Sequence, residues 1–139
     1  MTIPKEKQEK AKEKYVELKL AEQKLAQIQQ QIEQVSMQMM DVDETIQNIG
    51  LMKDVSPGTD IFVPVASGIF FPAKISSHDE LLVNVGNNVV VAKSLEESTS
   101  LLSEQIGELV KLRDELNAQN EKMVKHAQQL QKELQGLLE

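Results

Sequence analysis

Apolar residues repeat with a heptad period through the first third of the chain. They recur at alternating steps of three and four residues, at Leu18, Ala21, Leu25, Ile28, Ile32, Val35, Met39, Val42, Ile46 and Ile49. This spacing places the apolar side chains along one stripe of a helix, as in the seam of a coiled coil. Pro4 suits the first turn of such a helix, and Gly50 is the expected stop. The pattern predicts a helix over residues 5–50.

A second heptad ladder fills the last third of the chain. Ser94 and Glu97 have the capping-box spacing, in which the two side chains satisfy free backbone N–H groups at a helix start. Polar residues at seam positions set register, so we interpret Arg113 and Asn120 as alignment devices. The pattern predicts a second helix, over residues 94–139, that returns along the first as an antiparallel coiled coil. Its seam positions are Leu95, Thr99, Leu102, Ile106, Leu109, Arg113, Leu116, Asn120, Met123, Ala127, Leu130, Leu134 and Leu137.

Between the two ladders, residues 51–93 change to short β-rich runs separated by turn formers. The expected fold is mainly α with a central β segment: a long antiparallel two-helix coiled coil joined by two β-hairpins, in a single subunit of residues 1–139. The turn formers cluster at 55–58, 66–68, 76–79 and 86–88. They predict four strands, paired as two hairpins, at 61–65, 69–75, 81–85 and 89–93.

The predicted strands are apolar on both faces. Ile69, Phe71 and Ile75 alternate with Phe70 and Pro72 along the second strand. Isolated two-stranded hairpins are marginally stable in water, and burial gains ~25 cal/mol per Å² of apolar surface. We therefore expect the hairpins of several subunits to form a shared, oligomeric β-barrel body. The residues expected to carry this assembly are Phe62, Val65, Phe70, Phe71, Leu82, Val83, Val85, Val89 and Val91.

Composition and charge narrow the range of partners. The 139 residues carry a formal net charge of −7. Nucleic acids and anionic membrane surfaces attract clustered positive charge, so neither is an expected partner. The apolar runs fall short of the ~20 residues of a membrane-spanning helix, and the first residues form no apolar signal-peptide core. We expect a cytoplasmic protein with no nucleic acid and no membrane as partner.

The sequence predicts no catalytic or metal site. The chain has no Cys, which excludes thiolate metal sites and thiol nucleophiles. His78 precedes Asp79 in a turn, and we interpret it as a solvated loop residue instead of an acid–base or metal-binding group. His126 has no second His or carboxylate beside it at metal spacing. We expect a protein that is not an enzyme and that holds no cofactor and no metal.

The central segment resembles the α-class subunits of the prefoldin family. The stretch VPVASGIFFPAK at residues 63–74 resembles the first hairpin of that family. LLVNVG at 81–86 and VAKS at 91–94, followed by Glu97, resemble its second hairpin and helix entry. The first stretch is especially similar to the eukaryotic fifth prefoldin subunit. The order of helix, two hairpins and helix extends the resemblance over essentially the whole chain.

This resemblance implies an architecture and a function. It implies a hexamer of two α-class and four β-class subunits, with a double β-barrel body and six coiled-coil tentacles. The tentacle tips of such a hexamer hold unfolded client proteins and pass them to a group II chaperonin without ATP. The expected partners are therefore β-class prefoldin subunits, a second α-class subunit, client proteins and the chaperonin. The alternative is a structural coiled-coil adaptor subunit of a prefoldin-like scaffold complex.

Apolar residues near both termini exceed what one seam can hide, and we expect them to bind clients. In the alternative interpretation, Leu130, Leu134 and Leu137 continue the seam. Because Tyr15, Val16 and Leu138 lie off the ladder, they are the stronger candidates. The full set of candidates is Ile3, Tyr15, Val16, Leu20, Val124, Leu130, Leu134, Leu137 and Leu138.

A cluster of methionines offers a second candidate surface. Met39 belongs to the seam ladder, whereas Met37 and Met40 lie off it. Flexible Met side chains serve promiscuous binding, so Met37 and Met40 stay as alternative binding residues.

Overall fold

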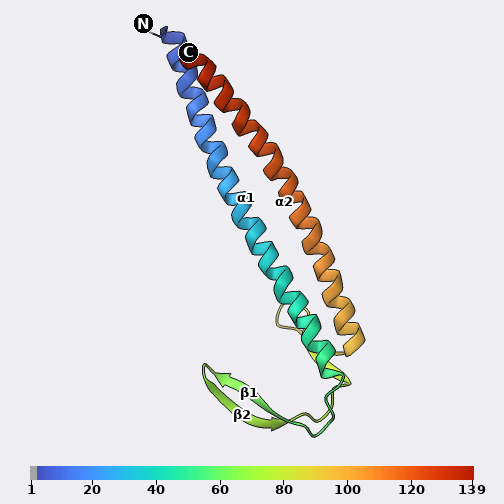
Figure 1. Ribbon diagram of the computed structural model, residues 1–139. Helices are drawn as coiled ribbons and strands as arrows, with labels where there is room; N and C mark the ends of the chain where they lie inside the picture. The colour runs from blue at the N-terminus through green and yellow to red at the C-terminus, as the bar shows by residue number, and fades with distance from the viewer. Residues whose placement is uncertain (1–2) are drawn as a thin grey trace. The chain divides into compact units, whose positions relative to one another are not determined.

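The computed structural model describes residues 3–139. They form two long helices and two β-hairpins, which confirms the predicted fold class (Figure 1). The chain divides into two compact units, described one at a time: residues 3–38 with Leu109–Glu139, and Met39–Glu108. The elements in order are α1 (Lys5–Met52), β1 (Asp60–Ala66), β2 (Ile69–Lys74), β3 (Glu80–Asn84), β4 (Val90–Ser94) and α2 (Leu95–Leu138).

The first unit is an antiparallel pair of helices held by an apolar seam. Leu18 and Ala21 of α1 and Leu130 of α2 form its buried cluster, against which Met123, Ala127 and Leu134 pack. The start of α1 and the end of α2 lie at the same end of this pair (Figure 1). All six residues occupy ladder positions, so the heptad pattern correctly identified the packed stripe. The other buried seam residues of this unit are Ala11, Ile28, Val35 and Leu116.

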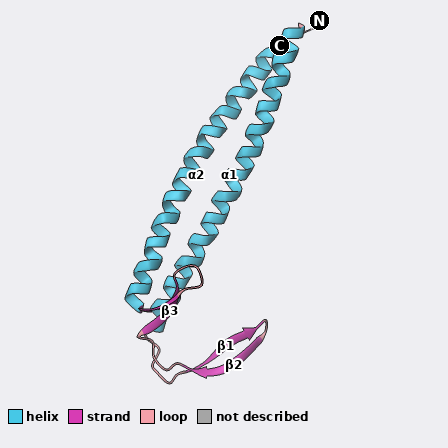
Figure 2. Cartoon of the chain, turned by 180° about the vertical axis from the view of Figure 1, so that it is seen from behind, coloured by secondary structure: helices cyan, strands magenta, loops and turns pink. Residues whose placement is uncertain are grey.

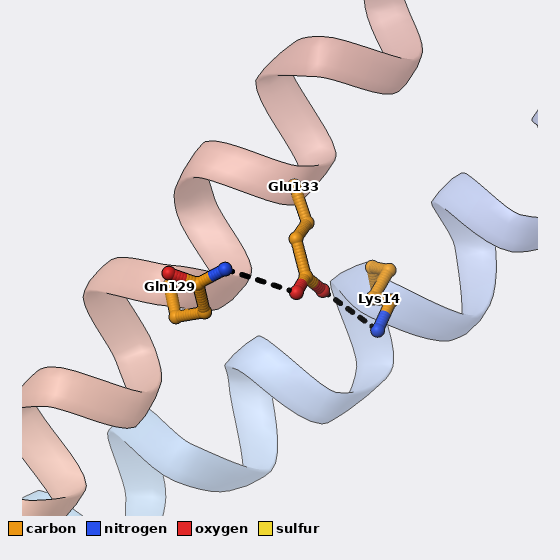
Figure 3. A network of polar contacts seen from close by, with 3 residues as sticks. All are labelled: Lys14, Gln129 and Glu133. Atoms are coloured by element: carbon orange, nitrogen blue, oxygen red, sulfur yellow. Dashed lines mark hydrogen bonds and ion pairs between the residues drawn. The ribbon is translucent and has the colours of Figure 1, made fainter.

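An ion pair joins the two helices beside this seam. The Lys14 ammonium lies 2.7 Å from Glu133 Oε2, and Gln129 Nε2 donates a 3.2 Å hydrogen bond to Glu133 Oε1 (Figure 3). The hydrogen bonds from Lys14 and Gln129 lower the pKa of Glu133, while the bond to Glu133 raises the pKa of Lys14. Both shifts favour the charged forms, so the pair is fully formed near neutral pH.

The two polar seam residues interpreted as alignment devices differ in their surroundings. Asn120 is half-buried, and its side-chain oxygen has no hydrogen-bond partner. Arg113 is also half-buried, and its guanidinium lies 3.8 Å from Asp114 Oδ1. A polar group in an apolar seam costs stability and discriminates between registers. Their role as alignment devices stays a prediction.

In the second unit, α1 ends later than predicted. It continues through Gly50 to Met52. The Asp54 N–H donates to the Leu51 carbonyl at 3.3 Å, and the Val55 N–H donates to the Met52 carbonyl at 3.2 Å. A glycine inside a helix costs only about 1 kcal/mol relative to Ala, which neighbouring turns offset. The helix gives way to a turn at Lys53 and Asp54, and a second turn follows at Pro57 and Gly58, where Gly58 has a φ of 91°.

The observed strands lie within one residue of the predicted strands at every boundary. β1 pairs with β2 antiparallel, with Phe62 opposite Pro72 (Figure 2). Their two-residue turn uses Gly68 at a φ of 78°, a left-handed conformation that glycine adopts without strain. β3 pairs with β4, with Leu82 opposite Ala92. The positive-φ residues of the second turn are Gly86, Asn87 and Asn88.

Both hairpins leave most of their apolar side chains exposed within the chain. Phe62 is 74% exposed and Leu82 is 78% exposed. Each hairpin is a separate two-stranded sheet, and the described residues form no closed sheet. The strands therefore expose much of the apolar surface that is predicted from the sequence to take part in assembly.

The predicted cap at the start of α2 is formed, with one difference. The Glu97 N–H donates to Ser94 Oγ at 3.1 Å, as the capping box requires. The Glu97 carboxylate accepts a 3.2 Å bond from the Ser94 hydroxyl instead of from a backbone N–H. Ser94 is also the last residue of β4, opposite Glu80. One side chain thus ends a strand and begins a helix.

We expect Ser94→Ala to lower the free energy of unfolding by about 1 kcal/mol, since the first turn of α2 loses its cap. Urea unfolding followed by circular dichroism measures this change. Ser103→Ala is the matched control, because Ser103 is exposed inside α2, where Ala is the better helix former. Equal effects of the two substitutions would contradict the capping role.

Glu133→Gln should destabilise the helix pair at pH 7, and the difference from the native chain should shrink in acid. Because the pKa of Glu133 is lowered, its contribution is present above the ordinary Glu value of 4.5 and disappears as the pH falls through the lowered pKa. Thermal unfolding at several pH values, with the exposed-face variant Glu121→Gln as control, measures this dependence. A difference that is constant with pH would contradict the ion pair.

Candidate functional site

An apolar groove lies at the end of the helix pair that carries both chain termini. We call it the tip groove. Its volume is about 520 Å³. Tyr15 is 52% exposed and Leu138 is 56% exposed along it. It is lined by Gln8, Ala11, Lys12, Tyr15 and Val16 of α1 and by Leu134 and Leu138 of α2.

The tip groove exists because α1 offers no large apolar side chain to the seam at this end. The two seam positions before Leu18 hold Ala11, which is small and buried, and Lys14, whose ammonium is directed to Glu133. Leu130, beside Leu18, is only 2% exposed. Leu134, one turn farther along, stays half-buried and lines the groove. The seam is thus closed at Leu130 and open at the tip.

Charged groups border the tip groove unevenly. Lys12 is the one charged side chain among its described lining residues. The Lys19 ammonium lies 5.4 Å from the centre of the Tyr15 ring, and it also pairs with Glu22 at 3.4 Å. The Glu22 carboxylate is the main reason why the pKa of Lys19 is raised. The cation over the ring holds Tyr15 in place without adding an unpaired charge.

The structure brings together the strongest sequence candidates. Tyr15, Val16 and Leu138 all line the tip groove, and Leu134 joins them. The remaining lining residues, including Ala11, were missed by the sequence analysis. Ala11 lies one heptad before Leu18, so extending the ladder by seven residues would have found it.

The other candidates lie elsewhere. Leu130 is in the seam core, where a client cannot reach it while the helices stay paired. Leu20 is exposed but lines a separate hollow of about 300 Å³ with Met123 and His126. Leu137 lines a third hollow beside Lys14 and Glu133. The remaining two, Ile3 and Val124, are half-buried.

Two further sets of candidates are exposed. Met37 in the first unit and Met40 in the second both present their side chains to solvent. Of the residues assigned to assembly, Val83 is half-buried and the rest are exposed in the single chain. The exposed ones are Phe62, Val65, Phe70, Phe71, Leu82, Val85, Val89 and Val91.

The two histidines differ in their surroundings. His78 lies in the loop between β2 and β3 as predicted, but the interpretation as a solvated residue is wrong: the side chain is half-buried, and its Nδ1 is buried without a hydrogen-bond partner, 3.7 Å from Asp79 Oδ1. His126 is exposed on α2. Within residues 3–139, no group of three or more His, Cys, Asp or Glu side chains could hold a metal ion. In the same range, no helix is both long enough and apolar enough to cross a membrane.

A solved structure resembles this fold. A chain in the cryo-EM structure of filamentous PFD from Methanocaldococcus jannaschii matches with a TM-score of 0.75 and 18% identity. The match covers 81% of this chain and 93% of that chain. At this identity the likeness supports the fold alone.

Sequence comparisons give the family. The chain is 31% identical to prefoldin subunit alpha of Thermofilum pendens over 85 residues, or 61% of this chain and 66% of the relative. It is 39% identical to that of Methanothrix thermoacetophila over 44% of this chain and 40% of the relative. It is 24% identical to that of Methanococcus aeolicus over 91% of this chain and 86% of the relative. The chain thus spans less than two-thirds of the length of the first two relatives. The family model described as "Prefoldin subunit" matches residues 21–139, and with these α-subunit relatives it shows that the chain belongs to the prefoldin family, as a subunit of the α type.

Proposed function

We propose that this chain is a subunit of an ATP-independent co-chaperone that captures unfolded proteins in the tip groove and delivers them to a group II chaperonin. The observation that carries the proposal is the exposure of Tyr15, Val16 and Leu138 on one groove. These three side chains lie outside the seam, so the helix pair does not need them for its own packing.

The tip groove suits many weak contacts better than one specific ligand. Unfolded chains present scattered apolar segments without fixed geometry. Burying one Val, Leu or Phe side chain gains about 1.5–3 kcal/mol, from which the cost of ordering both partners is subtracted. A single groove therefore binds weakly. Several arms on one assembly raise the effective affinity through multivalency, which supports a chaperone that works as an oligomer.

The exposed hairpins support assembly with other prefoldin subunits. Phe62 and Leu82 are largely exposed on separate two-stranded sheets, and such sheets gain stability when another sheet covers them. We propose that residues 51–93 contribute to a β-barrel body shared with a second α-class and four β-class subunits. In this proposal, residues 5–50 and 94–139 form one of its projecting arms.

Replacing the three exposed groove residues should weaken client capture. We expect the triple variant Tyr15→Ser, Val16→Ser and Leu138→Ser to bind a denatured client about tenfold more weakly or worse, because it loses apolar contact area. Light scattering on dilution of a denatured protein into the assembled complex measures the loss of protection.

The matched control for this triple variant is Met37→Ser with Leu112→Ser, two exposed positions of the first unit outside the groove. Unchanged protection by the triple variant would remove the tip groove from the site. If only the control variant loses protection, the binding site is the surface that carries Met37 instead of the tip groove. Tight binding to one folded partner without protection would favour the adaptor.

Native mass spectrometry of the complex isolated with its natural partners should show a hexamer that contains two α-class chains. We expect Phe71→Ser with Leu82→Ser to weaken assembly while the helical circular dichroism signal persists, because both residues are exposed on the hairpins. A folded native chain that stays monomeric with these partners at micromolar concentration would contradict the assembly proposal.

A further inference from the structure

We infer that the tip groove prefers apolar segments that carry an acidic residue beside the apolar core. This inference rests on the proposed function and narrows its client class. A volume of about 520 Å³ is within the range of about 300–1,000 Å³ that is typical of ligand pockets, so the groove has room for a short run of apolar side chains.

The charge at the groove comes from Lys12. Two neighbouring lysines are paired within the chain: Lys14 with Glu133 at 2.7 Å and Lys19 with Glu22 at 3.4 Å. Lys10 lies on the separate hollow beside Leu137. Lys12 lines the groove and makes no ion pair within the described residues. An ammonium at the edge of an apolar groove attracts a carboxylate on the bound segment.

Carboxylates of the chain itself lie outside the lining of the groove; those nearest in sequence are Glu9 and Glu13 beside Lys12 and Glu139 after Leu138. None of its described lining residues is Asp or Glu. The whole chain carries a net charge of −7, so its long-range field repels acidic segments. A preference for acidic segments must therefore come from the local ammonium, and salt should remove it.

Ala11 allows an independent test of the same groove. Ala11 is buried at a seam position and lines the groove. A Leu at this position adds an apolar seam residue and occupies space that a bound segment needs. Ala11→Leu should therefore weaken peptide binding without weakening the helix pair, since the added side chain fills the groove and carries no charge.

The test uses two fluorescein-labelled peptides with the same apolar core, Leu-Phe-Val-Ala-Leu, flanked by Asp or by Lys. Fluorescence anisotropy with the full chain at about 0.02 M salt measures both dissociation constants. We expect the Asp-flanked peptide to bind about two- to fivefold more tightly, as for an exposed ion pair.

The variant Lys12→Glu should reverse this order of affinities. The variant Lys24→Glu, on the separate hollow beside Leu20, should leave the order unchanged. Ala11→Leu should weaken both peptides while thermal unfolding occurs at the same or a higher temperature.

Equal affinities, or a preference for the Lys-flanked peptide, overturn the acidic preference. If the serine triple variant nevertheless binds both peptides more weakly than the native chain does, the proposed capture of apolar segments stands. Binding of both peptides that neither Ala11→Leu nor the serine triple variant weakens overturns the groove as the site, and the proposed function fails with it. Absence of binding to either peptide at chain concentrations up to about 1 mM, where even a weak single groove would be occupied, has the same consequence.

Discussion

Two helices packed side by side can bury only one stripe of side chains on each, and the first unit has no other layer. Every apolar residue outside the stripe is therefore exposed unless something else covers it. Leu18, Ala21 and Leu130 fill the stripe and close it. Tyr15, Val16 and Leu138 lie beside it and stay exposed. The same limit applies to a two-stranded hairpin, which has no second layer of its own.

The tip groove follows from this limit together with a local weakness of the seam. Ala11 and Lys14 replace the large apolar residues found deeper in the pair, so the end of the seam is open on one side. The ion pair of Lys14 with Glu133 holds the two helices together there without filling the groove. Polar and small residues thus keep the helices paired where apolar packing is reduced. An open, weakly packed end suits ligands without a fixed shape.

The two exposed apolar surfaces make different demands on their partners. Side chains on the hairpins, such as Phe62 and Leu82, project from regular strands that a matching sheet can cover completely. The tip groove is open to solvent and is bordered by the long side chain of Lys12, which favours exchangeable contacts. Permanent assembly at one surface and transient capture at the other are consistent with this difference. A single groove binds weakly, so its use as a binding site depends on several copies acting together.

The sequence by itself determined the elements of this protein, because their signals are local. The heptad period predicted both helices, Ser94 and Glu97 marked the start of α2, and Gly68 marked a hairpin turn. Only the tertiary structure decided which seam leucines are closed. Leu130 and Leu134 are both leucines at seam positions of the ladder, yet the first is buried and the second lines a groove. That difference depends on which residues of α1, more than a hundred positions away, lie beside each leucine. The pairing register sets those neighbours, and no local pattern encodes it.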